Sequence, residues 1–142
     1  MHDEGPASGS SMIRTPVRSY QDLIVWQRSM ELVDAVYDVV VTLPRDERFE
    51  LASQLRRASV SIAANIAEGH GRQRSGAFAR HVSIARGSTL ELDTLLLIAR
   101  RRRLAEPSSV ERCLALADEV SRMLASLIRR LEVARVQARR SQ

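Results

Sequence analysis

The stretch AFARHVSIARGSTLELDTLLLIA (residues 77–99) decides the fold class of this chain. Its apolar and small residues recur at alternating steps of four and three, which is the heptad spacing of helices packed in bundles. These positions are Phe78, Val82, Ala85, Thr89, Leu92, Leu96 and Ala99. A helix over about residues 76–102 is therefore predicted, with one face buried against other helices.

The chain before this stretch predicts a first helix over about residues 20–43. Ser19 with Asp22 can cap its start, and Pro44 must end it because proline has no amide hydrogen to donate. Its expected core stripe is Leu23, Trp26, Met30, Val33, Tyr37 and Val40.

A second helix is predicted from near Asp46, its cap, to Gly69, with the segment GHGRQRSG (69–76) as a loop because glycine favours chain reversal. A fourth helix begins at Pro107 and continues to about residue 137. Its apolar positions are Leu114, Ala117, Val120, Leu124, Leu127 and Leu131, and those of the second helix are Leu51, Leu55, Ala58, Ile62 and Ile66.

The predicted fold class is all-α: an up-down-up-down antiparallel four-helix bundle, because short loops place successive helices side by side. Residues 1–18 are expected to be a disordered N-terminal leader, with Met1 and Met12 as alternative starts. Residues 19–137 form the bundle and residues 138–142 a basic C-terminal tail.

Helices one and three carry more apolar residues than one bundle interior needs. Those off the main stripes are Ile24, Val25, Leu32, Val36, Val39, Ile84, Leu90, Leu95 and Leu97. A second apolar face predicts self-association, and a single wide core stripe is the alternative.

Composition limits the function classes. The 142 residues are 44% apolar and contain one cysteine, Cys113. No apolar run approaches the roughly 18 residues of a membrane span, and an unpaired thiol without an apolar leader is typical of a cytoplasmic protein. No histidine, cysteine or carboxylate group has the spacing of a metal site or a catalytic constellation, so we expect no enzyme activity, metal or cofactor.

The formal charge of +5 is unevenly distributed. Residues 1–43 carry −3, residues 44–99 carry +2 and residues 100–142 carry +6, and the four arginines between Glu68 and Glu91 have no acid among them. All 22 basic residues are arginine, which we attribute to codon usage in a GC-rich genome, with selection for guanidinium chemistry as the alternative. The acid-free segment predicts a local positive field.

Guanidinium groups bind phosphate oxygens bidentately, so clustered arginines are candidates for nucleic-acid contact. The candidates are Arg72, Arg74, Arg80, Arg86, Arg100, Arg101, Arg102 and Arg103, and Arg129, Arg130, Arg135, Arg139 and Arg140 follow near the C-terminus. The alternative is that Arg100–Arg103 only complement the negative end of a helix dipole and that the C-terminal arginines are simply solvated. With 4% aromatic residues for base stacking, recognition of backbone and shape is expected.

A polar stripe on the second helix predicts a seam with the third. If the turn centres near Arg72, Ser83 lies opposite Ser61, Gly87 and Ser88 lie opposite Arg57, and Glu91 lies near Gln54. Within this seam Arg57 and Glu91 can form an ion pair, with Asn65 and Ser88 as hydrogen-bond partners. The predicted structural polar seam is Arg57, Ser61, Asn65, Glu68, Ser88 and Glu91. Such a buried pair more often sets helix register than performs chemistry, and a binding role is the alternative. His81 is expected at the surface or its edge.

Three segments together resemble a known family: YQDLIVWQRSMELVDAVY (20–37), LASQLRRASVSIAANIAEGHGR (51–72) and RHVSIARGSTLELDTLLLIA (80–99). Over about residues 20–130 the chain resembles the bacterial four-helix-bundle family named for proteins encoded in intervening sequences of 23S ribosomal RNA. It is similar, more distantly, to the accessory variability determinant of diversity-generating retroelements. The family pattern marks Trp26, Arg57, Ser61, Asn65, Glu68, Gly69, Gly71, Arg72, Arg86, Ser88 and Glu91.

The resemblance implies a homopentamer with a central channel and a positively charged surface that binds nucleic acid and, in the retroelement case, a reverse transcriptase. We therefore expect a non-enzymatic, cytoplasmic homo-oligomer, a pentamer above other states, that binds RNA or DNA through arginine–phosphate contacts. The alternative is a protein-interaction scaffold whose basic surface docks an acidic partner protein.

Overall fold

A computed structural model describes residues 16–72 and 75–141 of the chain. Most of this part lies in four helices, α1 (Ile24–Val40), α2 (Leu51–Arg72), α3 (Ser75–Arg101) and α4 (Pro107–Arg140). Two short 3-10 helices precede the first two, η1 (Tyr20–Asp22) and η2 (Arg45–Glu47), and the described residues contain no strand. The all-helical, four-helix class predicted from the sequence is confirmed.

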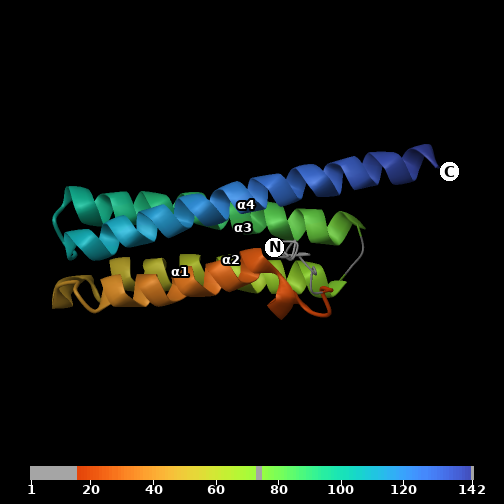
Figure 1. The fold of residues 1–142 in the computed structure, drawn as a ribbon. Coiled ribbons are helices and arrows are strands. Elements are labelled where there is room, and N and C mark those ends of the chain that lie inside the picture. The colour runs from red at the N-terminus through yellow and green to blue at the C-terminus, as the bar shows by residue number, and fades with distance from the viewer. Residues whose placement is uncertain (1–15, 73–74, 142) are drawn as a thin grey trace, which may run out of the picture.

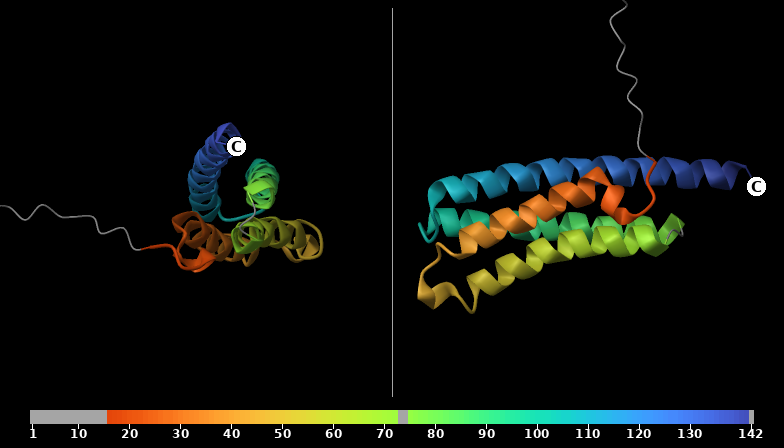
Figure 2. Two further views of the ribbon diagram at one scale, coloured as in Figure 1. Left: turned by 90° about the vertical axis from the view of Figure 1, so that its right-hand side faces the viewer. Right: turned by 60° about the horizontal axis from the view of Figure 1, so that its bottom comes forward.

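The four helices lie side by side, each returning along the one before it (Figure 1). α1 packs against α2 and α4, and α3 packs against the same two helices, so the bundle surrounds one core (Figure 2). At one end the amide of Glu106 donates a hydrogen bond to Thr42 Oγ1 at 3.1 Å, which ties the α3–α4 connection to the end of α1.

Branched aliphatic side chains from all four helices fill the core. The largest fully buried ones are Leu32, Val36, Val39, Leu55, Ile62, Ile66, Val82, Leu92, Leu96, Val110, Val120 and Leu124. The predicted stripe of α2 is buried throughout, and that of α3 is buried except for the partly buried Phe78. Burial of this apolar surface, at about 25 cal/mol per Å², is the main force that holds the helices together.

The core face of α1 differs from the predicted one. Met30 and Tyr37 of the expected stripe are 39% and 46% exposed. The buried residues are Val25, Ser29, Leu32, Ala35, Val36 and Val39. Both sets have helical spacing, so periodicity alone could not separate them. The buried face contains the small Ser29 and Ala35, and small side chains let α1 approach its two neighbours closely.

The start of α1 is interrupted. Ser19 and Asp22 form the predicted capping box, but they cap η1 rather than α1. Leu23 then has an extended backbone, with φ −73° and ψ 124°, so the predicted helix over residues 20–43 is divided and α1 itself begins at Ile24.

The predicted loop at residues 69–76 is wrong over most of its length, because α2 continues through Gly69 and Gly71 to Arg72. Gly69 is buried, and a Cβ placed on it would lie 2.7 Å from the Cβ of His81. Glycine here serves the close approach of α2 and α3 rather than chain reversal. At its other end α2 begins at Leu51, later than predicted, since η2 occupies the expected first turn.

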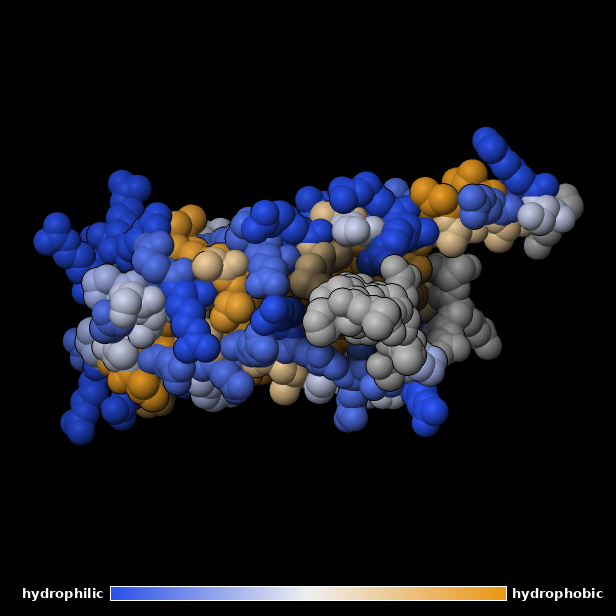
Figure 3. Space-filling model, viewed as in Figure 1, coloured by the Kyte–Doolittle hydropathy of each residue, from blue (hydrophilic) through white to orange (hydrophobic). Residues whose placement is uncertain are grey.

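α4 begins at Pro107 as predicted but continues beyond residue 137 to Arg140. Its last turns extend past the start of α3 (Figure 1), and every residue from Glu132 to Ser141 is exposed. The side of the molecule in Figure 3 is mostly hydrophilic, with separate apolar patches. None of the helices in the described ranges is long and apolar enough to cross a membrane.

Candidate functional site

A polar seam joins α2 to α3 through side-chain hydrogen bonds. The hydroxyl oxygens of Ser61 and Ser88 lie 2.9 Å apart, and His81 Nδ1 lies 3.0 Å from Asn65 Oδ1. The amide nitrogen of Asn65 also donates to the carbonyl oxygen of Ser61 at 2.8 Å. The first two hydrogen bonds cross a partly buried interface, where removing one partner leaves the other polar group unsatisfied.

The register of this seam differs from the predicted one. Ser88 faces Ser61 rather than Arg57, and Asn65 bonds His81, which was expected at the surface or its edge. The reason is that α2 runs almost one turn beyond its predicted end, which moves the chain reversal further along the sequence. His81 is consequently drawn into the interface, where its side chain is only 14% exposed.

The predicted ion pair between Arg57 and Glu91 is not formed within the chain. Arg57 Nη2 donates instead to Ser53 Oγ at 3.2 Å, and Glu91 is exposed. At the end of the seam Glu68 pairs with Arg72 at 2.8 Å, and its carboxylate is 3.9 Å from His81 Nε2. The seam therefore combines an inner pair of side-chain hydrogen bonds with an outer, solvated ion pair.

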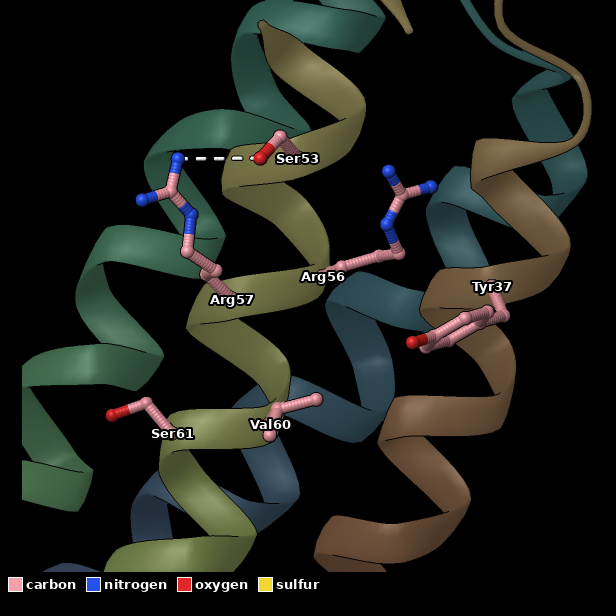
Figure 4. Close-up of a pocket in the computed structure, with 6 residues that line it drawn as sticks. All are labelled: Tyr37, Ser53, Arg56, Arg57, Val60 and Ser61. Atoms are coloured by element: carbon pink, nitrogen blue, oxygen red, sulfur yellow. Dashed lines mark hydrogen bonds between the residues drawn. The ribbon is translucent and has the colours of Figure 1, made fainter. Parts of the chain in front are cut away.

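A shallow hollow of about 570 Å³ lies over the outer side of α2 (Figure 4). Its lining residues are Tyr37, Ser53, Arg56, Arg57, Val60 and Ser61. Figure 4 shows the two guanidinium groups on opposite sides of α2, with Arg56 directed toward Tyr37 of α1 and Arg57 toward α3. Neither takes part in the ion pairs found within residues 16–72 and 75–141.

Arg56 was missed as a site candidate by sequence reasoning. The available signal is the segment 51–67, in which Arg56 and Arg57 are the only charged residues. A helix interior with two adjacent arginines and no acid within a turn leaves the guanidinium groups without a partner on their own helix.

The eight predicted nucleic-acid-binding arginines do not form one surface. Arg72 and Arg80 lie where α2 ends and α3 begins, and Arg74 lies outside the described residues. Arg100–Arg103 lie at the other end of α3, whose 27 residues span about 40 Å at 1.5 Å per residue. Arg86 is on α3 between the two groups.

Carboxylates accompany the Arg100–Arg103 group. Arg100 Nη1 pairs with Glu111 Oε1 at 2.9 Å, and Arg102 lines a depression together with Glu47 and Glu50. Arg103 has a φ of 56°, so its backbone makes the turn that follows α3. The positive field at this end is therefore weaker than the run of four arginines indicates.

Contacts between α3 and α4 show how the two helices are aligned. Arg100 of α3 meets Glu111 of α4. Burial, and then the nearby carboxylate of Asp118, raise the pKa of Asp93. A step of seven residues back along α3 thus corresponds to a step of seven forward along α4.

This alignment places the acid-free part of α3 beside the basic half of α4. A further step of seven brings Arg86 level with Ala125, about one helical turn from Arg122 and Arg129. The side chains of these arginines are exposed, and α4 has only Glu132 as an acid after Glu119. We call Arg86, Arg122 and Arg129 the α3–α4 basic face. Its two halves are more than 30 residues apart in the sequence, so only the packing reveals that they are neighbours.

The remaining reactive groups are isolated. No three histidine, cysteine, aspartate or glutamate side chains in the described part of the chain could hold a metal ion together. Cys113 is buried, and burial raises the pKa of its thiol to about 11, which keeps it protonated and unreactive at neutral pH. The chemistry that the exposed surface offers is the binding of anions by guanidinium groups.

Comparison with known proteins agrees with the fold. The family model described as "23S rRNA-intervening sequence protein" matches residues 21–126. A solved structure of a protein with unknown function from the S23 ribosomal protein family of Bacteroides thetaiotaomicron VPI-5482 has a TM-score of 0.69 and 24% identity, and the match covers 74% of this chain and 98% of that chain. At this identity the likeness concerns the fold alone. Comparison with curated proteins finds no match.

Proposed function

Because the chain belongs to the 23S rRNA-intervening sequence protein family, we propose that it is a non-enzymatic, cytoplasmic homo-oligomer that binds RNA or DNA through arginine–phosphate contacts. The observation that carries this proposal is the alignment of the acid-free segment of α3 with the basic half of α4. The arginines of these two segments, which are far apart in the sequence, can then contact the same nucleic acid.

Phosphate binding suits this surface physically. The ion pair within it is exposed: Arg122 Nη2 lies 2.7 Å from Asp118 Oδ2, and these side chains are 76% and 65% exposed. Exposed pairs contribute only about 0–1 kcal/mol, so a phosphate can replace the carboxylate at little cost. The only tryptophan, Trp26, is partly buried against the core, so stacking on bases has little part in the proposed contact.

The proposed oligomer forms through an apolar face on α1, α2 and α3. We define this face by Met30, Tyr37, Val60 and Ile84, which are 39%, 46%, 46% and 45% exposed. Tyr37 and Val60 also line the hollow over α2, so the face is concave enough to receive side chains of a second copy. A homopentamer of up-down-up-down antiparallel bundles is the assembly that we propose.

Two charged residues beside this face support assembly. Arg57 and Glu91 do not pair with each other inside the chain, and neither takes part in an ion pair in the described ranges. Across a copy-to-copy interface Arg57 of one protomer can meet Glu91 of the next, which satisfies both charges and sets the orientation of the contact.

The nucleic-acid proposal is tested by fluorescence anisotropy with a structured RNA and a duplex DNA at about 50 and about 200 mM salt, because phosphate-driven binding weakens steeply over this range. Arg86→Glu/Arg129→Glu should weaken binding to all sequences alike. The matched control is Arg101→Glu/Arg102→Glu, which reverses two charges at the opposite end. Absence of binding by the wild-type protein at the lower salt would overturn the proposal.

Light scattering tests the assembly. The wild-type protein should have the mass of an oligomer, and Val60→Glu/Ile84→Glu should reduce that mass because it places charge on the apolar face. The control Leu97→Glu changes a side chain of α3 with similar exposure, 43%, that is outside this face and should leave the mass unchanged. A monomeric wild-type protein would contradict the proposed interface.

The second candidate function is that of a scaffold for an acidic partner protein. The observation that favours it is the exposure of Leu90 and Leu97, 58% and 43%, on the same helix as Arg86, since mixed apolar and basic surfaces are typical of protein interfaces. A pull-down from lysate with and without nuclease separates the two functions. Under this alternative, an acidic protein stays bound after the nucleic acid has been digested.

A further inference from the structure

The last turns of α4 project beyond the rest of the bundle. Figures 1 and 2 show α4 continuing past the start of α3, and every residue from Glu132 onward in the described chain is exposed. The family match ends at residue 126, well before the helix ends at Arg140. We call residues Glu132–Arg140 the C-terminal arm. At 1.5 Å per residue it is about 13 Å long.

The arm and the turn before it are strongly basic. Five arginines lie between residues 129 and 140, with Glu132 as the only acid in that interval: Arg129, Arg130, Arg135, Arg139 and Arg140. None of them takes part in the ion pairs found within the described residues. Their positive charge is therefore not neutralised by the protein itself.

Apolar and charged side chains share one side of the arm. At 100° per residue, Arg139 and Arg140 fall on either side of Val136. Val136 is 49% exposed and Val133, one turn earlier, is 55% exposed. By the same angle Val133 lies about 60° from Val136 on the side of Arg140, and Glu132 lies about 40° from Val136 on the side of Arg139. The two valines therefore share this side of the arm with charged residues.

These features favour a polyanion over a protein groove as the ligand. A helix that binds a protein groove needs apolar anchors at successive i, i+3 and i+7 positions. After Val133 and Val136 the next such position is Arg140, so the apolar series stops. Two valines bury little apolar surface, whereas the arginines along the arm can reach several phosphates of a polyanion.

We propose that the C-terminal arm inserts into the major groove of B-form DNA, with its arginines, Arg139 and Arg140 among them, on the backbone phosphates. A helix with its side chains is about 10–12 Å across, and this groove is about 12 Å wide. The major groove of paired A-form RNA is too narrow to admit it. The inference rests on the proposed function, since it adds a second binding surface to the α3–α4 basic face.

The position of the arm is measured with a fluorophore on the full-length variant Gln137→Cys. The native thiol does not compete for the label, because Cys113 is fully buried and the pKa of its thiol is about 11. A duplex DNA of about 20 base pairs should change the emission of the label. A fully paired RNA duplex of the same length should bind without changing it.

The contribution of the arm to affinity is measured on unlabelled protein. Arg139→Gln/Arg140→Gln should weaken DNA binding about tenfold at about 50 mM salt and lower the salt slope by about 0.9 for each phosphate that the variant no longer binds. Arg101→Gln/Arg102→Gln removes the same charge at the other end of the bundle and should have little effect. Both pairs are exposed, so circular dichroism should show unchanged helix content.

The outcomes separate this inference from the proposed function. If the wild-type protein binds neither DNA nor RNA, the proposed function fails and the arm has no groove to enter. If the wild-type protein binds DNA and the arm variant binds it equally well, the arm inference alone is overturned. A label that responds equally to paired RNA overturns the groove assignment. A response to polyglutamate as strong as that to DNA would make the arm a docking helix for an acidic protein.

Discussion

His81 Nδ1 on α3 lies 3.0 Å from Asn65 Oδ1 on α2, and this hydrogen bond crosses the interface about one helical turn from the buried Gly69. The amide oxygen of Asn65 can only accept, so His81 donates its Nδ1 proton. The other end of the Asn65 amide donates to Ser61, which holds the side chain in place. Asn65 therefore links the backbone of its own helix to the side chain of the next.

Replacement of Asn65 should destabilise the bundle measurably. Asn65→Ala removes the acceptor of His81 inside a partly buried interface, and we expect a decrease of about 1–3 kcal/mol in the free energy of unfolding. Urea denaturation followed by circular dichroism measures this decrease. The control Ser83→Ala, at an exposed position of α3, should change stability by less than about 0.5 kcal/mol. Equal stability of the two variants would contradict a structural role for the seam.

The two glycines near the end of α2 should respond in opposite ways to alanine. In Gly69→Ala the new Cβ would lie 2.7 Å from His81 Cβ and 3.1 Å from Phe78 Cδ2, so the helices must separate at a cost of about 1–3 kcal/mol. In Gly71→Ala nothing lies within 4 Å, and the better helix propensity of alanine should stabilise by about 0.5–1 kcal/mol. Thermal unfolding of both variants gives the comparison, and a stabilised Gly69→Ala protein would refute the close packing at this point.

The core face of α1 can be tested by paired truncation. Leu32 is fully buried, and Leu32→Ala should cost about 2–5 kcal/mol, because apolar surface is no longer buried and a cavity remains. Met30 is 39% exposed, and Met30→Ala should cost far less in the protomer. Denaturation is measured at a concentration where the protein is monomeric, so that assembly does not contribute. If Met30→Ala lowered the free energy of unfolding more than Leu32→Ala does, the core face of α1 would be the one predicted from the sequence.

The stability of the protein should depend on pH through Glu106. Its carboxylate accepts hydrogen bonds from the hydroxyl and amide of Ser108 and of Ser109, and these bonds lower its pKa from 4.5 to about 2. A lowered pKa in the folded state means that the stabilisation is complete above pH 4.5 and disappears as the pH falls toward 2.

The variant Glu106→Gln isolates this effect. Its melting temperature should be below that of the wild-type protein at pH 7, and the difference should shrink between pH 4.5 and pH 2. Glu132→Gln changes an exposed glutamate at the other end of α4 and serves as the control. A difference that stays constant over this pH range would show that the carboxylate charge does not cap the helix.

Much of the fold was predictable because helical periodicity is strong in most of the chain. The predicted core stripe of α2 is buried, and Val82, Leu92 and Leu96 of α3 are all at 0% exposure. The exceptions have local causes. Gly69 looks like a helix end in the sequence because glycine often terminates helices, but here its missing side chain admits a neighbouring helix.

The candidate site was less predictable than the fold. The sequence identified the arginines of α3 and the basic end of the chain, but not that Arg86 lies level with the space between Arg122 and Arg129. It placed Arg100–Arg103 in the same site, whereas the structure separates them from Arg72 and Arg80 by the length of α3. Adjacency between distant segments depends on register, and a shift of a few residues changes every pair along the interface.

The amino-acid sequence by itself determined that this chain forms four helices, which residue types occupy their core faces in α2, α3 and α4, and where positive charge is concentrated. Periodicity and composition are local properties, so they can be read without knowing the neighbours. Only the tertiary structure decided which face of α1 is buried, that Ser61 meets Ser88, and that α4 continues past the bundle as an exposed basic arm. The register of Ser61 and Ser88 depends on how closely the backbones of α2 and α3 can approach, which is settled where Gly69 meets His81 rather than within either helix alone.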